Sequence, residues 1–218
     1  MKKILSFLVI AFLPVVAMAS DYQEGKHYVK VQELAVKSPE VREYFSFYCG
    51  HCFKFEIMAK SIANNLPEGT SFVKNHVDFL PGASRKMQSL LSRALITAQE
   101  MEMAESQIAA IFNYIHVHRA VFTSQKDVRN VFVLNGADGD KFDQLINSDT
   151  VNKQVEVMKS NQDILAKSGD LKSVPTVIVN GKYRVIGPTH DHSHKQGSNE
   201  ENTKQEYNNL VKYLLTLD

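Results

Sequence analysis

The sequence has only two cysteines and no tryptophan among its 218 residues, and Cys49 and Cys52 stand three positions apart. A disulfide framework is excluded, because small exported domains that depend on disulfides carry several bridges. A bridge between these two residues would close a very short loop, and the chain-entropy gain of a disulfide falls with loop length. The pair is therefore better explained by redox chemistry than by structural stabilisation.

An excess of charge of either sign is also absent, because 25 Lys and Arg residues stand against 24 Asp and Glu residues. Nucleic-acid-binding proteins usually carry basic patches, and nothing in this composition predicts a nucleic-acid partner. Long apolar runs are absent beyond the N-terminus, so we do not expect an integral membrane protein. Hydrophobic residues make up 44% of the chain, which favours a folded globule.

The first nineteen residues are typical of a secretory signal peptide. Two lysines precede an apolar run over residues 4–16, and Ala17 and Ala19 supply the small residues of a cleavage site. The run is shorter than the roughly 20 residues of a membrane span and is interrupted by Pro14. We therefore predict cleavage after Ala19 and export of a free protein, and a short lysine-led leader suits the bacterial periplasm.

The hydrophobic pattern predicts a strand, a helix and a strand around the cysteines. Residues 27–31 and 41–48 are rich in β-branched and aromatic residues, which favours strands. After Cys49 the apolar residues recur every three or four positions, the period of a helix, and residues 71–79 again predict a strand. Such a crossover favours parallel pairing of the second and third strands.

The rest of the chain predicts a helical block followed by a return to the sheet. Residues 81–169 carry several amphipathic helical patterns, one of which begins at a capping-box-like segment led by Ser124. Asn180-Gly181 between two β-rich runs predicts a hairpin. A closing amphipathic helix is predicted over residues 203–217.

The two cysteines stand where the second strand gives way to the first helix. Unpaired backbone N–H groups and the helix dipole at such a position stabilise a Cys49 thiolate, which is the nucleophile and the better leaving group. His51 can stabilise this thiolate further when it is protonated, whereas Cys52, one turn inside, is suited to attack a mixed disulfide. A zinc site needs four ligands, and the sequence has no second cysteine pair.

Other residues are candidates by position alone. Glu43 lies on the strand that leads to the cysteines, so it is either an exposed edge carboxylate or a half-buried acid that relays a proton at Cys52. Pro175 precedes a predicted strand and is either an ordinary edge proline or a cis residue in a tight turn. His116 and His118 flank a predicted helix end and are interpreted as surface residues or partners of the helix dipole.

Several of these segments together resemble the DsbA family of periplasmic disulfide oxidoreductases. They are Phe45-Ser46-Phe47-Tyr48-Cys49-Gly50-His51-Cys52, Leu66-Pro67-Glu68-Gly69, and Val174-Pro175 with Asn180-Gly181-Lys182-Tyr183. The resemblance implies an α/β thioredoxin fold, with a central mixed β-sheet flanked by helices and an inserted all-helical subdomain. The chain then divides into a signal peptide (1–19), thioredoxin-like parts (20–80 and 170–218) and the helical insertion (81–169).

For the site, the resemblance implies that Pro175 is cis and faces the cysteines, that the Val174 backbone pairs with an extended substrate, and that Glu43 is a buried acid. It implies a hydrophobic groove for unfolded exported proteins, which are the substrates, and a quinone-linked, DsbB-like oxidase of the inner membrane as the reoxidant. We expect no cofactor and no metal, and a monomer.

The function implied is donation of the Cys49–Cys52 disulfide to newly exported, unfolded proteins through a mixed disulfide. A disulfide isomerase or reductase is the nearest alternative. A non-catalytic metal or copper carrier would use the two cysteines and perhaps His190, His192 and His194, although such a histidine-rich run is more often a solvated loop. A holdase without redox chemistry is a third alternative, and its activity would not depend on Cys49.

One departure from the family pattern concerns the two residues between the cysteines, which are usually Pro-His in the family and are Gly50-His51 here. Glycine loosens the start of a helix, so the N–H groups that stabilise the thiolate are oriented less firmly. We predict a protein that is less oxidising than a typical member. Gly50→Pro should raise its reduction potential, measured by equilibration with glutathione, and an unchanged or lower potential would contradict this interpretation.

Overall fold

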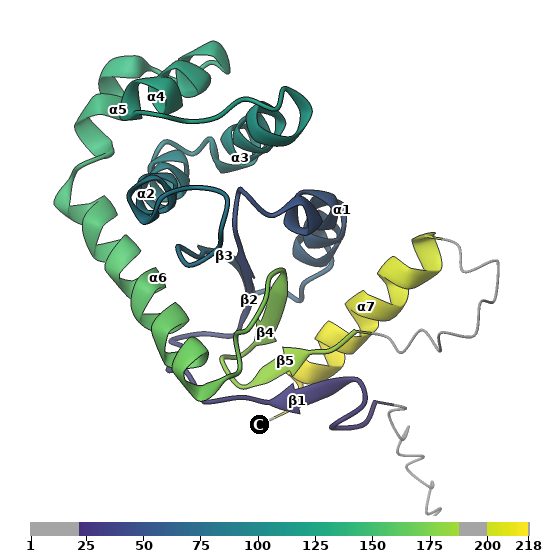
Figure 1. Ribbon diagram of the computed structural model, residues 1–218. Helices are drawn as coiled ribbons and strands as arrows, with labels where there is room; N and C mark the ends of the chain where they lie inside the picture. The colour runs from purple at the N-terminus through teal and green to yellow at the C-terminus, as the bar shows by residue number, and fades with distance from the viewer. Residues whose placement is uncertain (1–21, 188–199, 218) are drawn as a thin grey trace, which may run out of the picture.

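The sheet at the centre of the computed structural model is mixed and has five strands, in the order β1-β5-β4-β2-β3 (Figure 1). The strands are β1 (Tyr28–Lys30), β2 (Glu40–Phe45), β3 (Ser71–His76), β4 (Thr176–Val179) and β5 (Tyr183–Val185). β2 and β3 are parallel, as the crossover predicts, and all other neighbours are antiparallel. The structure describes residues 22–187 and 200–217, so the predicted signal peptide and the histidine-rich run at 190–194 lie outside the described residues.

The helices fall into two groups. Helix α1 (Gly50–Asn64) connects β2 to β3, and α7 (Glu200–Leu215) closes the described chain beside it (Figure 1). Between β3 and β4 the chain forms the helical insertion, which contains α2 (Arg85–Glu100), α3 (Ala104–Phe112), a π-helical turn (Asn113–Val117), α4 (Gln125–Leu134), α5 (Gly139–Leu145) and α6 (Asp149–Ser168). Figure 1 shows α2 to α5 gathered beyond one end of the sheet, with the long α6 running back along its side.

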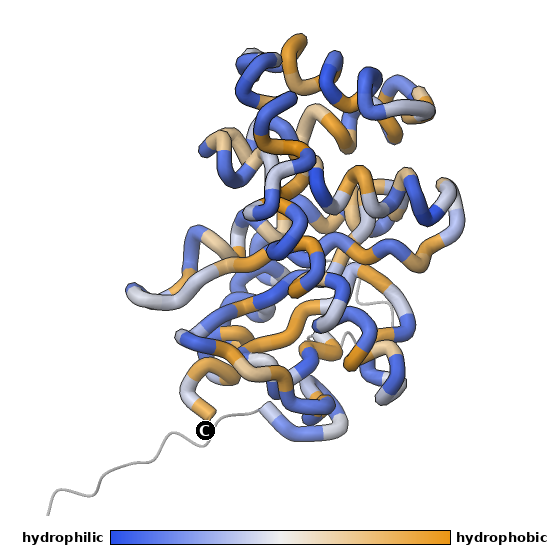
Figure 2. Tube along the Cα trace, turned by 90° about the vertical axis from the view of Figure 1, so that its left-hand side faces the viewer, coloured by the Kyte–Doolittle hydropathy of each residue, from blue (hydrophilic) through white to orange (hydrophobic). Residues whose placement is uncertain are grey.

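Strand β4 shows how the sheet is covered on both faces. Successive side chains of a strand point to opposite faces. Val177 and Val179 therefore belong to one buried cluster with α1 and α7, whereas Ile178 packs with Leu165 of α6 in another. Figure 2 shows the matching pattern in the helices, where hydrophobic and hydrophilic residues follow one another at short intervals along the chain.

A third core joins the helical insertion to the end of β2. Phe45, Phe47 and Phe112 are fully buried in it, and the ring centroids of Phe47 and Phe112 lie 5.1 Å apart in an edge-to-face arrangement. Phe53 of α1 adds a fourth ring, 5.7 Å from Phe112. Such aromatic pairs contribute beyond the area that they bury. Phe47, two positions before Cys49, and Phe53, directly after Cys52, thus pack against Phe112 of α3.

Short-range signals in the sequence match the structure closely. Ser124 and Asp127 form a reciprocal capping box at the start of α4, as predicted. Asn180 and Gly181 both have positive φ, at 50° and 65°, which is the backbone of the tight hairpin turn that Asn-Gly favours. Glycine is also required by packing, because a Cβ on Gly181 would lie 2.4 Å from the carbonyl oxygen of Leu34.

Element ends are where the predictions fail. The strand predicted to reach residue 48 ends at Phe45, because the next residues turn back: Cys49 N–H donates to the Ser46 carbonyl at 3.0 Å and Tyr48 N–H donates to the Ser46 hydroxyl at 3.2 Å. Helix α7 begins at Glu200 rather than at residue 203, with two glutamates in the first turn, where the helix dipole favours them.

The aromatic core between the helical insertion and β2 supplies a test of stability. Phe112→Ala should lower the free energy of unfolding by about 3–5 kcal/mol, because it removes a fully buried ring that contacts three other phenylalanine rings. Urea denaturation measures this change. Leu134→Ala, at a side chain that is 84% exposed, is the control and should change stability by less than about 0.5 kcal/mol. Equal effects of the two variants would show that this core is not packed as described.

Candidate active site

Cys49 is the N-cap residue of α1, with an extended backbone (φ −94°, ψ 109°). Its sulfur accepts a hydrogen bond from the N–H of Cys52 at 3.1 Å, so an amide that the helix leaves unpaired is directed at the thiol. Both cysteines are free thiols, and Cys49 is partly exposed whereas Cys52 is fully buried. A partner from solution can therefore reach Cys49 only, and Cys52 can act on it from inside.

Pro175 stands beside this pair. The Val174–Pro175 peptide bond is cis, and the Cys49 thiol donates to the Val174 carbonyl at 3.5 Å. The antiparallel register of β2 and β4 sets Tyr44 opposite Thr176, so the segment that leads into β4 lies next to the turn that carries Cys49. The edge-proline alternative is therefore wrong.

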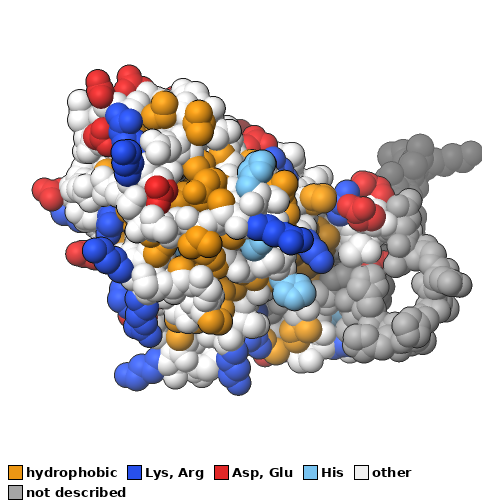
Figure 3. Space-filling view, turned by 45° about the horizontal axis from the view of Figure 1, so that its top comes forward, with side chains coloured by type: hydrophobic (Ala, Val, Ile, Leu, Met, Phe, Trp, Pro, Cys, Tyr) orange, Lys and Arg blue, Asp and Glu red, His pale blue; other side chains and the backbone are white. Residues whose placement is uncertain are grey.

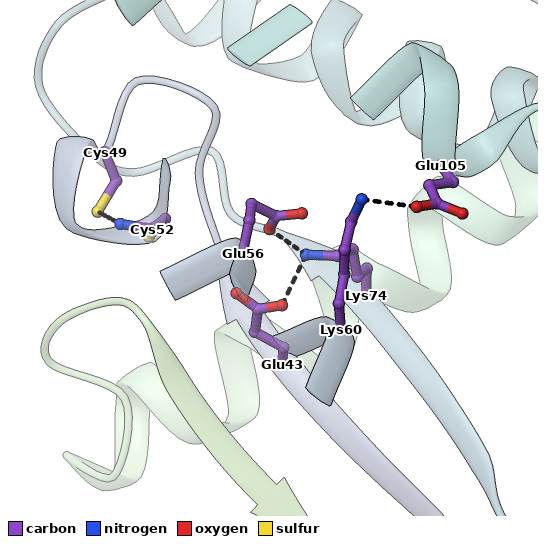
Figure 4. A network of polar contacts seen from close by, with 7 residues as sticks. All are labelled: Glu43, Cys49, Cys52, Glu56, Lys60, Lys74 and Glu105. Carbon is purple, nitrogen blue, oxygen red and sulfur yellow. Dashed lines mark hydrogen bonds and ion pairs between the residues drawn. The ribbon is translucent and has the colours of Figure 1, made fainter. Parts of the chain in front are cut away.

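Glu43 is fully buried, so the exposed-edge alternative is wrong as well. One carboxylate oxygen accepts from Lys74 Nζ at 2.7 Å, and the same ammonium contacts Glu56 at 2.5 Å (Figure 4). The Lys74 ammonium also lies 4.5 Å from the centre of the Phe45 ring. The other oxygen of Glu43 has no hydrogen-bond partner in the described structure. Burial raises the pKa of Glu43 to about 7, although Lys74 acts in the opposite direction.

The Cys52 thiol shares this buried environment. Burial raises the pKa of Cys52 well above the usual range of a thiol, and its contact with Cys49 and the negative charge of Glu43 act in the same direction. The thiolate form of Cys52 is thus unfavourable, and the protonated thiol is the preferred form. Glu43 is an acid whose charge acts on this thiol, and its own pKa lies near neutral pH.

The structure shows His51 without the predicted interaction with Cys49. Its side chain is exposed at the second residue of α1, and its ring makes no hydrogen bond to the described part of the chain. Stabilisation of the Cys49 thiolate by His51 remains a prediction.

Sequence reasoning missed two contacts in this region. Lys74 sits directly opposite Glu43 in the parallel register of β2 and β3, a pairing that the crossover pattern could have indicated. His116 is half-buried in the last turn of the π-helical segment, and its Nε2 lies 2.8 Å from the carbonyl oxygen of Phe47, a contact that its interpretation as a surface residue or dipole partner did not include. That partner is 69 positions away, and no local pattern in the sequence points to it.

The described residues contain neither a metal-binding cluster nor a helix that could cross a membrane. No group of three or more His, Cys, Asp or Glu side chains is placed to hold a metal ion within 22–187 and 200–217. Within the same ranges, no helix is both long enough and apolar enough to cross a membrane.

The reachable Cys49 and the enclosed Cys52, at the start of a helix that leaves a mixed sheet, define a thiol:disulfide oxidoreductase of the thioredoxin type. The chain belongs to the DsbA family, because the model of the DSBA-like thioredoxin domain matches residues 40–193. The predicted fold class, family and type of activity are thereby confirmed.

The chain is similar to DsbA proteins along nearly its whole length. The chain is 32% identical to the thiol:disulfide interchange protein DsbA of Pectobacterium carotovorum, over 99% of both chains, and 32% identical to that of Escherichia coli K12, over 98% of both. Among solved structures, DsbA of Proteus mirabilis superposes with a TM-score of 0.74 at 26% identity, covering 90% of this chain and 98% of that one. A complex of Proteus mirabilis DsbA with a non-covalently bound peptide, PWATCDS, gives 0.76, covering 91% of this chain and 100% of that one at 26% identity.

The raised pKa of Glu43 generates a prediction about stability and pH. The folded protein binds a proton at Glu43 that the unfolded chain releases above about pH 4.5, so the free energy of unfolding falls as pH rises from there to about 7. Glu43→Gln cannot ionise and should escape this loss. Relative to the wild-type protein, the free energy of unfolding of oxidised Glu43→Gln should rise by on the order of 3 kcal/mol between pH 4.5 and pH 8.

Urea denaturation of the oxidised proteins across this range measures the difference, and the oxidised form keeps the two thiols from titrating. Glu68→Gln, at an exposed position, is the matched control and should show no such gain. A stability difference between Glu43→Gln and wild type that stays constant from pH 4.5 to pH 8 would contradict a buried, ionisable Glu43.

Proposed function

We propose that the protein donates the Cys49–Cys52 disulfide to newly exported, unfolded proteins in the periplasm. A client thiolate attacks the Cys49 sulfur, a mixed disulfide forms, and the bond to Cys52 breaks with Cys52 leaving as a thiolate. A second client thiolate then attacks the client sulfur of the mixed disulfide and releases Cys49. The client loses two electrons and gains a disulfide, and the cysteine pair is left reduced.

The unequal exposure of the two sulfurs carries this proposal. Only Cys49 is open to a client, and its sulfur already accepts the Cys52 amide, so its thiolate is a stabilised leaving group in the second step. In the first step Cys52 leaves into a buried site where its charge is disfavoured. Glu43, protonated in part near neutral pH, is the group that we assign to protonate it.

A client chain would bind beside Val174 and Pro175. The Val174 carbonyl lies at the Cys49 sulfur, where an extended peptide could add its backbone hydrogen bonds. The complex of the Proteus mirabilis protein with a non-covalently bound peptide supports the binding of a peptide chain by a protein of this family. Val117 and Val121, 58% and 64% exposed, follow His116 in the chain and add apolar surface. Figure 3 shows hydrophobic side chains gathered on one face, with histidines beside them, as binding of unfolded chains requires.

The proposal extends to the cycle and the location of the protein. A quinone-linked inner-membrane oxidase of the DsbB type would remove two electrons from the reduced pair and restore the disulfide. The signal peptide would direct export and be cleaved after Ala19, and the mature protein would act as a monomer. Its thioredoxin-like parts would span residues 20–80 and 170–218, with the helical insertion over 81–169.

The test measures whether client oxidation requires Cys49 and whether the reduction potential is that of a disulfide donor. Cys49→Ser should lose oxidation of a reduced, unfolded client down to the uncatalysed background, whereas wild type and Glu68→Gln remain active. The reduction potential of the wild-type pair, equilibrated with glutathione, should lie well above the value of about −270 mV of thioredoxin. A potential near or below that value would favour a reductase, and activity retained in Cys49→Ser would overturn the proposal.

A further inference from the structure

His116 connects the helical insertion to the active-site turn. It lies in the π-helical turn that follows α3, where His118 N–H donates to the Asn113 carbonyl at 2.9 Å. The Nε2–H of His116 donates to the Phe47 carbonyl at 2.8 Å. A carbonyl can only accept, so this bond fixes which ring nitrogen carries the hydrogen. π-Helical turns of this kind are frequent at functional sites.

The imidazole makes further contacts around the two cysteines. Its ring stacks on Phe53, which directly follows Cys52, with centroids 5.2 Å apart and an angle of 9° between the planes. A Cβ added to Gly50 would lie 4.0 Å from its Cε1, in ordinary van der Waals contact. His116 thus contacts Phe47 and Phe53, on either side of the two cysteines, and lies where it would meet a side chain at residue 50.

We propose that His116 is a positioning residue for the redox reaction, which holds the start of α1 from the side and so compensates for the missing side chain of Gly50. A glycine at the first helical position leaves the backbone of that turn free to move. The turn must keep the Cys52 N–H directed at the Cys49 sulfur, and this contact stabilises the thiolate form over the disulfide. A ring bonded to Phe47 and stacked on Phe53 restricts the turn at both ends.

Another connection between the insertion and α1 lies away from this turn. Lys60 of α1 and Glu105 of α3 form an exposed ion pair at 2.6 Å (Figure 4). Such exposed pairs contribute little to stability. Glu105→Gln therefore provides a matched control, because it removes a connection between the same two parts of the molecule without changing the surroundings of Cys49.

The experiment compares three variants of His116 and one control variant through the equilibrium between the protein and glutathione. His116→Ala should make the protein disulfide about three- to tenfold weaker as an oxidant of glutathione, the effect of one lost hydrogen bond. His116→Gln keeps a side-chain donor and should recover most of this loss, whereas His116→Phe keeps only the stacked ring and should recover less. Glu105→Gln should leave the equilibrium unchanged.

This readout separates positioning from simple stabilisation. If His116 served only to stabilise the fold, its loss would lower the stability of the oxidised and reduced forms equally, and the equilibrium with glutathione would not move. An unchanged equilibrium in His116→Ala would therefore overturn the proposal. The inference rests on the Cys49–Cys52 redox site and not on the direction of the proposed function, because the equilibrium is measurable whether the protein acts as a donor or a reductase.

A double-variant cycle tests the compensation for Gly50. Proline fits at residue 50, because Cys49 already has the extended backbone that precedes a proline and the first helical position needs no N–H. Proline fixes the turn by itself, so His116→Ala should have less than half its effect on the glutathione equilibrium in the Gly50→Pro background. Additive effects of the two changes would show that His116 does not substitute for a side chain at residue 50.

Discussion

The hydrogen bond from the Cys52 amide to the Cys49 sulfur is the contact on which the rest of the site depends. It exists only because β2 ends at Phe45, the chain turns at Ser46, and α1 begins directly after Cys49. The helix leaves this amide unpaired, and an anion or thiolate is the acceptor that such an amide favours. Val174 then encloses the same sulfur from the side of β4. The end of β2, the turn at Ser46, the start of α1 and the Val174 carbonyl thus all meet at the Cys49 sulfur.

The ionisation states of three side chains, Glu43, Glu56 and Lys74, depend on one another. Lys74 contacts two carboxylates, so the cluster of Glu43, Glu56 and Lys74 carries a net negative charge whenever both acids are ionised. Burial disfavours that state most strongly at Glu43. The negative charge of this acid in turn disfavours ionisation of Cys52, a buried thiol that cannot easily hold its own charge.

Local rules in the sequence account for most of the fold and part of the site. The crossover from β2 through α1 to β3, the capping box at Ser124 and the hairpin at Asn180 each depend on residues within a few positions, and each was predictable. The burial of Glu43 was implied only by the resemblance to the DsbA family, because burial depends on how the elements pack together and the local pattern left an exposed edge position equally open. His116 was missed for the same reason, since its contact with Phe47 depends on how the helical insertion packs against β2.

Lys74 has a second consequence, which follows from its place in the sheet. β3 is an edge strand in the described structure, paired with β2 alone, and such an edge presents free backbone groups to any extended chain nearby. A charged side chain that points inward from an edge strand is one of the features that discourage pairing with a further strand. The lysine that accompanies the buried acid therefore also protects the edge of the sheet from aggregation, in a protein that would work among unfolded chains.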